Sequence, residues 1–369
     1  MPSLRIPLIF CLMLSFLASA CASRQPTSDA PRGKAAVIPA KTPDRGGGRK
    51  IDPALPQKTD QAAHGQSKRP GRVAPSWRPL LERLRSDNLG DAEYREYFKE
   101  LADYSPEPMG TKIRELFTNA FLRRPPKKIE GPILPPKARI YRKVVTEAAR
   151  EKCAAFLEEH REAFAAAENR FLVPREILVA LLYLETRLGE YLGSANALWT
   201  LACMAAATEP EQLEGGMGDL PISEKHAGWL RASLANKSAW AYQELKALLV
   251  YCRSNETDPR GLTGSVYGAI GLCQFMPSNI VPYGQDGNGD GRVDLFNPAD
   301  AVFSAASYLN RHGWERNISP DQQRALLRRY NNLMTYANTI LTLAESVRTG
   351  VLQSAPPDMA GEVLNRPSP

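Results

Sequence analysis

The sequence predicts a mainly α-helical protein. Apolar residues recur at intervals of three and four from Trp77 onward, as they do along one face of a helix. No segment sustains the alternation of apolar and polar residues that is typical of a half-buried strand. With 43% hydrophobic and 24% charged residues among 369, the chain has an ordinary globular composition. We therefore expect helices packed around a hydrophobic core.

The first twenty residues predict a signal peptide. Arg5 supplies a positive charge, residues 6–17 are almost wholly apolar, and small residues occupy 18–20. This apolar run is too short for a stable membrane span, so we expect the mature protein to be exported. The small residues fit simple secretory cleavage, and together with Cys21 they resemble a bacterial lipobox. We favour the second interpretation, in which Cys21 is lipid-modified and anchors the protein.

Residues 22–75 predict a disordered, basic linker rich in Pro and Gly. Eleven basic and four acidic residues give this segment a net charge of +7, which equals that of the whole chain. Because Arg5 adds one more positive charge, the remainder is near −1, which argues against a nucleic-acid-binding face. We favour a solubilising linker over weak attraction to anionic wall polymers or lipid headgroups. Residues 351–369 are expected to form a disordered tail.

Four cysteines remain if Cys21 is lipidated: Cys153, Cys203, Cys252 and Cys273. In an oxidising compartment they allow three pairings, and the sequence leaves all three open. The chain has no CxxC motif and no cluster of Cys and His, so we expect no zinc site.

The remaining elements follow from spacing and from proline. Helices are expected around 77–84, from 91 towards 101, and over roughly 111–122, which together form an N-terminal helical extension. Five prolines between 125 and 136 predict an extended connector, and helical structure is expected again over about 138–169. Residues 209–218 are expected to form a loop.

A helix after Pro174 carries the main candidate for catalysis. Proline suits a helix start, because the N–H it lacks is not needed there. Glu185 falls inside the apolar stripe of this helix, opposite Tyr183 and Arg187, and Gly189 lies near the expected end. An apolar face disfavours the charged carboxylate, so the pKa of Glu185 should rise until it can donate a proton near neutral pH. A buried glutamate paired with arginine for structural reasons is the alternative. The stripe consists of Ile177, Leu181, Leu184 and Leu188.

Residues 286–292 match the first half of an EF-hand loop, with oxygen donors at positions 1, 3 and 5 and Gly at position 6. Position 12 is Asn297 instead of the usual glutamate, so the match is incomplete. We expect a structural Ca²⁺ or Na⁺ site, and the alternative is an acidic turn without a tight ligand. The expected ligands are the side chains of Asp286, Asn288, Asp290 and Asp300 and the backbone carbonyl of Arg292.

Four blocks of sequence follow one another along the chain. They are Val173–Ile177 with Glu185–Gly189, Gly264–Gly271 with Gln274–Ser278, Asp286–Asp300, and Arg329–Asn332. Taken together and in this order, they resemble the membrane-bound lytic transglycosylase B family. The resemblance runs from about residue 77 to residue 347, and it also favours Asp300 as the substitute carboxylate. It implies a lysozyme-like helical core, and hence a catalytic domain over 76–350.

The resemblance implies cleavage of the bond between N-acetylmuramic acid and N-acetylglucosamine in peptidoglycan. In this family the C6 hydroxyl of muramic acid attacks C1 and leaves a 1,6-anhydro product, with one glutamate performing both proton transfers. That role would fall to Glu185. An ordinary glycosidase needs two carboxylates, whereas here a single one is expected. No cofactor is expected for catalysis, and the cation site would be structural.

The resemblance also implies saccharide contacts by Ser265, Gln274, Tyr330 and Asn331. Caps or turns are the alternative for Ser265 and Asn331, and a core position is the alternative for Tyr330. Cys273 stands where the family commonly has glycine, and the segment 193–261 is longer than in compact members. Both departures bear on the shape of the pocket.

The expected partners are peptidoglycan glycan strands and, through the lipid anchor, a membrane. This predicts a periplasmic protein anchored to the outer membrane, with no nucleic-acid partner. Two other functions remain as alternatives: a hydrolytic muramidase, which needs a second carboxylate near Glu185, and a non-catalytic peptidoglycan-binding protein.

Overall fold

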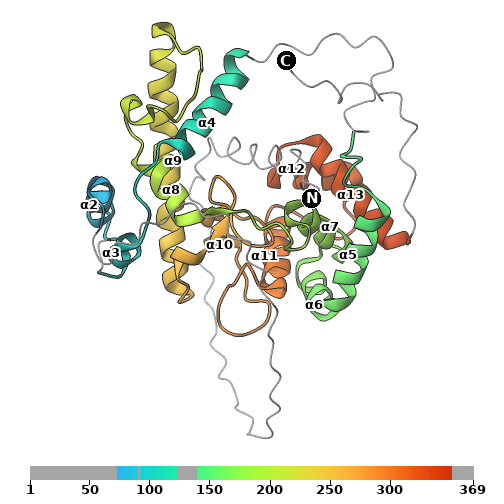
Figure 1. The fold of residues 1–369 in the computed structure, drawn as a ribbon. Coiled ribbons are helices and arrows are strands. Elements are labelled where there is room, and N and C mark those ends of the chain that lie inside the picture. Colours follow the sequence, from blue (N-terminus) through green and yellow to red (C-terminus); the bar gives the residue numbers. More distant parts are fainter. Residues whose placement is uncertain (1–72, 90–91, 123–138, 351–369) are drawn as a thin grey trace, which may run out of the picture. The chain divides into compact units, whose positions relative to one another are not determined.

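Helices make up almost all of the regular structure in the computed structural model, which describes residues 73–89, 92–122 and 139–350 (Figure 1). The prediction of a mainly α-helical protein is therefore confirmed. Several predictions lie outside the described residues. They are the signal peptide 1–20, Cys21, nearly all of the linker 22–75, the proline-rich connector 125–136 and the tail 351–369.

The N-terminal helical extension is built around buried aromatic rings. The indole of Trp77 packs edge-on against Phe98 and Tyr104, with ring centroids 5.7 and 6.4 Å apart. The helix expected over 111–122 begins earlier, and its last turn is π-helical. The elements are η2 (Pro75–Trp77), α2 (Arg78–Ser86), α3 (Ala92–Lys99), α4 (Glu107–Phe117) and the π-helical η3 (Thr118–Leu122).

The helical structure expected over about 138–169 is divided into two helices, which meet at His160. These are α5 (Glu147–Glu159) and α6 (Arg161–Phe171). Thr146 caps the first of them by accepting the Ala149 N–H at 3.2 Å. His160 leaves the helical conformation, although no Gly or Pro marks the break. The break lets α6 pack on α11 (Pro298–Arg311) while α5 packs on α13 (Met334–Thr349).

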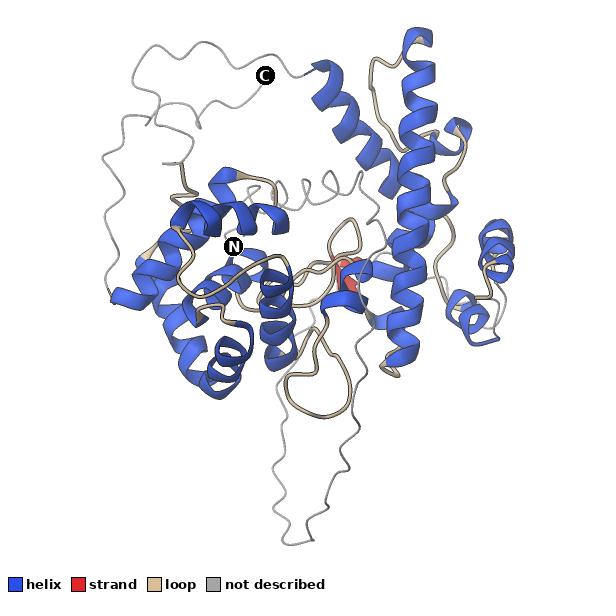
Figure 2. Ribbon diagram, turned by 180° about the vertical axis from the view of Figure 1, so that it is seen from behind, coloured by secondary structure: helices blue, strands red, loops and turns tan. Residues whose placement is uncertain are grey.

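The long segment 193–261 folds mainly into two helices that pack on each other, α8 (Ala197–Ala206) and α9 (Ala227–Ser254). The stretch 209–218, predicted as a loop, contains one short 3₁₀ helix. Two short strands pair antiparallel, Ala195 opposite Gly264 (Figure 2). The other elements are η5 (Pro210–Leu213), η6 (Glu224–His226), η7 (Pro259–Gly261), β1 (Ala195–Asn196), β2 (Thr263–Gly264), α10 (Pro277–Tyr283) and α12 (Pro320–Tyr330).

Helix α7 (Arg175–Thr186) packs on α5, α6, α11 and α13. The single apolar stripe predicted for it is too narrow, because every residue from Ile177 to Thr186 is buried, Tyr183 included. A helix that is apolar nearly all round belongs in a core. The helix ends at Thr186, slightly before the expected Gly189.

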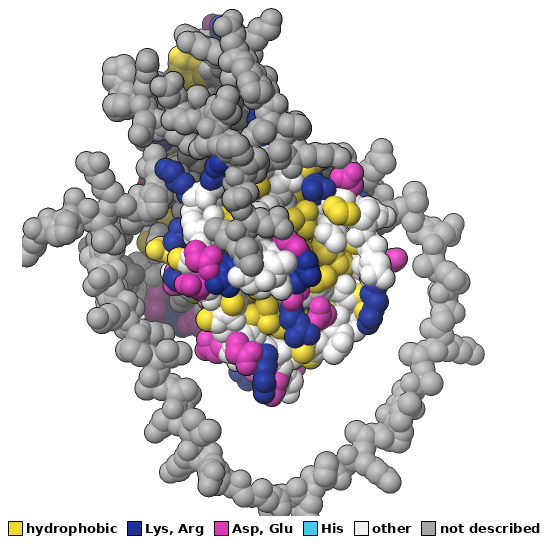
Figure 3. All heavy atoms as spheres, turned by 90° about the vertical axis from the view of Figure 1, so that its right-hand side faces the viewer, with side chains coloured by type: hydrophobic (Ala, Val, Ile, Leu, Met, Phe, Trp, Pro, Cys, Tyr) yellow, Lys and Arg dark blue, Asp and Glu magenta, His cyan; other side chains and the backbone are white. Residues whose placement is uncertain are grey.

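All four described cysteines, at 153, 203, 252 and 273, are buried free thiols, so none of the three pairings occurs. Burial raises the pKa of each thiol to about 12. On the face in Figure 3, basic and acidic side chains are interspersed. Within the described ranges, no helix has the length and apolar character needed to cross a membrane.

Gly271 is required where the segment before α10 meets residue 295. Its φ is +73°, and an added Cβ would lie 2.4 Å from the Leu295 Cβ and 2.5 Å from its carbonyl oxygen. Gly215 has nearly the same φ, +75°, and a Cβ there would meet nothing within 4 Å. An alanine at either position would have the same backbone strain, and only the one at position 271 would also overlap a neighbour. Comparing the two therefore measures the overlap alone.

We expect Gly271→Ala to destabilise the protein by about 1–3 kcal/mol more than Gly215→Ala. Both variants carry the backbone cost of a left-handed alanine, and the first also forces apart two packed segments. Urea unfolding of both variants and the parent measures the difference. Equal losses of stability would contradict the proposed overlap.

Candidate active site

Glu185 lies one residue before the C-terminal end of α7 and is 7% exposed. It comes from a run of leucines, and its neighbours Leu181, Leu182 and Leu184 are all buried. Removal from water penalises the charged carboxylate, and this burial raises the pKa of Glu185 to about 7. The predicted desolvation of Glu185 is thus present, and the carboxyl is poised to exchange a proton near neutral pH.

Tyr336, in the first turn of α13, donates its hydroxyl to Oε1 of Glu185 at 2.5 Å. This bond favours the charged carboxylate and partly offsets burial, so it lowers the pKa of Glu185. The tyrosine itself is 2% exposed, and burial beside the glutamate raises its own pKa far above the usual value. Tyr336 is therefore a permanent donor to Glu185.

Sequence reasoning missed Tyr336. The recognised block ended at Asn332, four residues earlier, and the tyrosine belongs to the next helix. Its one available signal was a tyrosine amid small and apolar residues near a helix start, which is equally typical of a core position. The contact with Glu185 joins positions 151 residues apart and needed the fold to be seen.

Tyr330 occupies the last residue of α12 and is 8% exposed. Its hydroxyl donates to the backbone carbonyl of Cys273, and its ring packs near Phe275 and Tyr308. Burial, together with Cys273 and Glu185, raises its pKa well above the usual value. Tyr330 thus lies near the predicted acid, and its hydroxyl is committed to the loop that carries Cys273.

The segment from Gly264 to Phe275 folds back on itself through two successive bridges, Gly264 with Ile270 and Ile270 with Phe275. We call residues 264–276 the site loop. It contains two residues predicted to contact saccharide, Ser265 and Gln274. Gln274 bonds to Leu192 after α7, and the backbone of Ser265 passes close to Gly193, where an added Cβ would lie 2.9 Å from the Ser265 nitrogen.

Ser265 is 3% exposed, and its Oγ accepts the N–H groups of Tyr267 at 3.3 Å and Ala269 at 3.0 Å. Ser265 therefore stabilises the turn that it belongs to, as the turn interpretation of this serine expects. Neither bond uses the hydroxyl hydrogen, which stays available to a substrate oxygen.

Gln274 adopts a left-handed backbone with φ of +49°, which is unusual for a residue other than glycine. Its Nε2 donates to the carbonyl oxygens of Gly271 at 3.0 Å and Leu192 at 3.3 Å. These two bonds tie the site loop to the segment after α7. The Oε1 acceptor of Gln274 is not used by them.

Asn331 directly follows Tyr330 at the end of α12 and is 5% exposed. Its Oδ1 is one of three buried side-chain polar atoms without a hydrogen-bond partner in the described part of the chain. A buried acceptor without a donor costs roughly 1–3 kcal/mol, so a native protein rarely leaves one without a use. A sugar hydroxyl or acetamido N–H would satisfy it.

Thr186 links the catalytic helix to the site loop. Its Oγ1 lies 3.0 Å from the carbonyl oxygen of Leu272 and accepts the Gly189 N–H at 3.1 Å. The three residues that follow Thr186 have positive φ values, 51° at Arg187, 63° at Leu188 and 95° at Gly189. Strained backbone of this kind persists where the surroundings over-determine it, and it gathers at functional sites.

The predicted cation loop closes on Asp300, which is fully buried in the first turn of α11. The Asp300 carboxylate accepts three backbone N–H groups, from Gly287 at 2.9 Å, Asn288 at 3.2 Å and Asp294 at 2.7 Å. Asn297 instead caps α11 by accepting the Ala299 N–H, so it does not serve as a ligand at position 12.

The donors predicted at the tip of the loop also accept backbone N–H groups. Asp286 accepts from Gly289 and Gly291, and Asp290 accepts from Arg292 at 2.9 Å. Within the described ranges there is no group of three or more His, Cys, Asp or Glu side chains suited to a metal ion. Three of the predicted donors, Asp286, Asp290 and Asp300, are carboxylates, and the structure does not bring them together into such a group. The predicted donors are all oxygen atoms, which is the chemistry that a hard cation takes.

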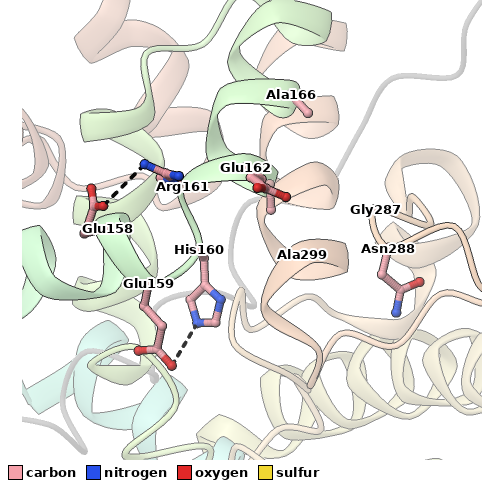
Figure 4. Close-up of a pocket in the computed structure, with 10 residues that line it drawn as sticks. Glu158, Glu159, His160, Arg161, Glu162, Ala166, Gly287, Asn288 and Ala299 are labelled. Atoms are coloured by element: carbon pink, nitrogen blue, oxygen red, sulfur yellow. Dashed lines mark ion pairs between the residues drawn. The ribbon is translucent and has the colours of Figure 1, made fainter. Parts of the chain in front are cut away.

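A cavity of about 520 Å³ lies away from Glu185, between the α5–α6 corner and the cation loop (Figure 4). Glu158 pairs with Arg161, and Glu159 with His160, on one of its sides. None of the residues predicted for acid chemistry or saccharide contact lines it. We therefore place the candidate site at Glu185 on its chemistry rather than at this cavity.

Glu185 should make stability depend on pH. Its pKa in the folded protein is about 7, against 4.5 for an unperturbed glutamate, so the protonated form stabilises the fold. This contribution is complete below about pH 4.5 and is lost as pH rises through 7. The free energy of unfolding of Glu185→Gln, taken relative to that of the parent, should therefore rise by about 3 kcal/mol between pH 4 and pH 8. Urea unfolding at both pH values measures this change, and an unchanged difference would show that Glu185 is not desolvated.

Comparison with known proteins identifies the family of this chain. The family model described as "Transglycosylase SLT domain" matches residues 135–323, about half of the chain. Membrane-bound lytic murein transglycosylase B of Escherichia coli is 31% identical over 176 residues. That alignment covers 48% of this chain and 42% of the relative, so the match spans less than half of that protein's length.

Two solved structures share the fold. Soluble lytic transglycosylase SltB1 from Pseudomonas aeruginosa gives a TM-score of 0.54 at 21% identity, over 74% of this chain and 98% of that one. The Escherichia coli lytic transglycosylase Slt35 in complex with calcium gives 0.54 at 20% identity, over 76% and 94%. The expected lysozyme-like, mainly helical fold is thus confirmed. With its buried glutamate at the end of α7 and the matched segment around it, this chain belongs to the transglycosylase SLT domain family.

Proposed function

We propose that this protein is a lytic murein transglycosylase that cleaves the MurNAc–GlcNAc β-1,4 bond of peptidoglycan and forms a 1,6-anhydromuramoyl end. The observation that supports this most strongly is Glu185, a buried carboxyl whose pKa is raised to about 7. A general acid works best with a pKa near the working pH, because it then both holds and releases its proton readily.

In the first step, protonated Glu185 gives its proton to the glycosidic oxygen as the bond from that oxygen to C1 breaks. The GlcNAc side leaves as an alcohol, and the substrate's acetamido group with nearby dipoles stabilises the positive charge at C1. Glu185 is now a carboxylate, and the hydroxyl of Tyr336, 2.5 Å away, stabilises that charge.

In the second step the carboxylate of Glu185 removes the proton from the C6 hydroxyl as the new O6–C1 bond forms. Glu185 is protonated again, no water is consumed, and the product carries a 1,6-anhydro ring. The tyrosine hydroxyl favours the carboxylate and burial favours the acid, so both forms of Glu185 are accessible in one cycle.

The surroundings of Glu185 favour this reaction over hydrolysis. Three described groups interact electrostatically with Glu185, namely the thiol of Cys273 and the phenols of Tyr330 and Tyr336. None is a carboxylate. A hydrolytic glycosidase needs a second carboxylate as base or nucleophile, whereas an internal hydroxyl nucleophile does not.

Four residues are proposed to hold the glycan strand. Ser265 would donate its hydroxyl hydrogen, Gln274 would accept through Oε1, and the orphan Oδ1 of Asn331 would accept from a sugar hydroxyl or acetamido group. Tyr330 would act mainly through its bond to the Cys273 carbonyl, which supports the floor of the site.

We further propose an exported, periplasmic protein, anchored to the outer membrane by a lipid on Cys21, with the catalytic domain at 76–350 joined to the anchor by the linker 22–75. The leader and lipobox patterns of the sequence support this, and the curated relative is itself called membrane-bound. The partner is peptidoglycan glycan strands.

The cation loop is proposed to bind calcium in a structural role. The donors are the side chains of Asp286, Asn288, Asp290 and Asp300 and the carbonyl of Arg292, and a solved structure of the same fold is a calcium complex. Sodium is the alternative ion. The ion would supply charge to the loop and has no part in the proton transfers.

Glu185→Gln should lower the rate of release of soluble muropeptides from purified sacculi by roughly 10²–10⁴-fold, because the amide cannot transfer the proton. Mass spectrometry of the parent's products should show anhydromuramoyl ends. Glu176→Gln, at the start of the same helix, is the matched control and should retain activity.

Each alternative function predicts a different result. Reducing muramoyl ends would identify a muramidase, and no release by the parent protein would indicate a peptidoglycan-binding protein. Full activity of Glu185→Gln would disprove the acid/base assignment.

Calcium at about a hundredfold over its dissociation constant should stabilise the protein by about 3 kcal/mol, a rise of a few degrees in melting temperature. Asp290→Asn should weaken calcium binding about tenfold or more, because it removes charge at the loop while keeping its shape. Asp219→Asn, an exposed change elsewhere, is the control. Calorimetry with calcium and sodium in turn checks this, and heat of binding from neither ion would contradict a cation site.

A further inference from the structure

Helix α4 carries a lysine that is removed from solvent. Lys112 is 1% exposed, and its Nζ donates to Oε2 of Glu115 at 3.0 Å. The same Nζ lies 4.5 Å from the centroid of the Tyr267 ring, a cation–π contact. Burying an ammonium group costs several kcal/mol unless it is paired, so this arrangement is tightly specified by its neighbours.

Tyr267 completes the cluster from the other side. Its hydroxyl donates to the same Glu115 oxygen at 2.7 Å, so the ammonium and the phenol converge on one carboxylate. Tyr267 is 3% exposed and belongs to the site loop. One buried contact thus joins α4 to the loop that carries Ser265 and Gln274.

The tyrosine cannot move without moving Ser265. The Tyr267 N–H donates to Ser265 Oγ, and the Gly268 N–H donates to the Ser265 carbonyl at 2.9 Å. The Ser265 N–H in turn donates to the Ala269 carbonyl at 2.8 Å. The turn is therefore closed on itself, with the acceptor side of the serine hydroxyl engaged by its backbone and its tyrosine ring reaching α4.

Helix α4 is itself firmly seated. Its Gly110 lies so close to Gly216 that an added Cβ would be 2.3 Å from the Gly216 carbonyl oxygen. Arg114 donates to the carbonyls of Gly216 and Met217 at 3.1 and 3.0 Å. Because these contacts hold α4 in place, its bond to Tyr267 can hold the site loop in one position.

We propose that Lys112, Glu115 and Tyr267 are positioning residues for glycan binding. They hold the Ser265 turn in the orientation that the saccharide requires, and they take no part in the proton transfers at Glu185. Lys112 and Glu115 precede the matched family segment 135–323, so the N-terminal extension contributes to substrate affinity. This inference rests on the proposed function.

The chemistry of the cluster indicates that it fixes one conformation of the site loop more than it adds to the free energy of unfolding. A buried ion pair is often no more stabilising than apolar residues of the same shape, although it does fix one geometry. Two donors that meet at a single carboxylate oxygen also set the angle between the helix and the tyrosine ring. A change to that geometry should be seen in substrate affinity first.

The test is steady-state kinetics of Tyr267→Phe on soluble, peptide-bearing glycan strands. The variant keeps the ring and its contact with Lys112, and it loses the bond to Glu115. We expect KM to rise roughly fivefold, in keeping with the loss of one hydrogen bond, with kcat within twofold and an unchanged pH profile. Glu115→Gln, which removes the charge and keeps the shape, should act in the same direction.

Tyr104→Phe is the matched control. Tyr104 belongs to the N-terminal extension, and its hydroxyl donates to the Gln212 carbonyl at 2.9 Å, so it makes a long-range hydrogen bond that does not involve the site loop. This variant should have the KM of the parent. Thermal unfolding of all three variants shows whether they are folded at the assay temperature.

An unchanged KM in folded Tyr267→Phe and Glu115→Gln would overturn the inference while leaving the parent's activity intact. A fall in kcat, or a shifted pH profile, would also overturn it, because the cluster would then act on Glu185. If the parent protein releases no muropeptide, the proposed function fails instead, so the two failures are distinguishable.

Discussion

The burial of α7 is the constraint on which the rest of the structure depends. The helix is enclosed by α5, α6, α11 and α13, and its residues from Ile177 to Thr186 are all buried. The same enclosure that gives the fold its core removes water from Glu185 and raises the pKa of its carboxyl to about 7. Stability and acid strength therefore have one origin, and the protein cannot hydrate this glutamate without opening its centre.

The end of α7 shows how that burial is reconciled with access to a substrate. Thr186 joins the helix to the site loop, and three successive left-handed residues turn the chain away at once. The backbone cost of such a turn is set against hydrogen bonds from both sides of it. As a result, the carboxyl lies in the core although it is one residue from the helix end.

The sequence was sufficient to predict features that depend on local pattern. The helical class and the burial of Glu185 follow from spacing over a few turns, whereas its place in a recognised block comes from the resemblance to a family. The break at His160 could not be predicted, because no Gly or Pro marks it and packing of α6 on α11 decides it. Tyr336 was missed for a related reason, since its partner lies 151 residues away.

The predicted saccharide residues show a further limit. Gln274 bonds to the segment after α7 and Tyr330 interacts electrostatically with Glu185. Yet Ser265, Gln274 and Tyr330 each use hydrogen bonds to hold the backbone of the site. Residue type indicates what a side chain can bind, while the fold decides which of its atoms remain free. Asn331 is the clearest case, because its unused oxygen is visible only once every neighbour is placed.

The close approach of Gly271 to Leu295 has a consequence for how this protein can be altered. The Leu272 N–H donates to the Leu295 carbonyl at 2.9 Å, and no side chain fits between the two segments. The cation loop and the site loop therefore form one unit for exchange between homologues. A chimaera that takes residues 286–300 from a relative must take 271–272 with them, or the graft boundary will cut through their contact.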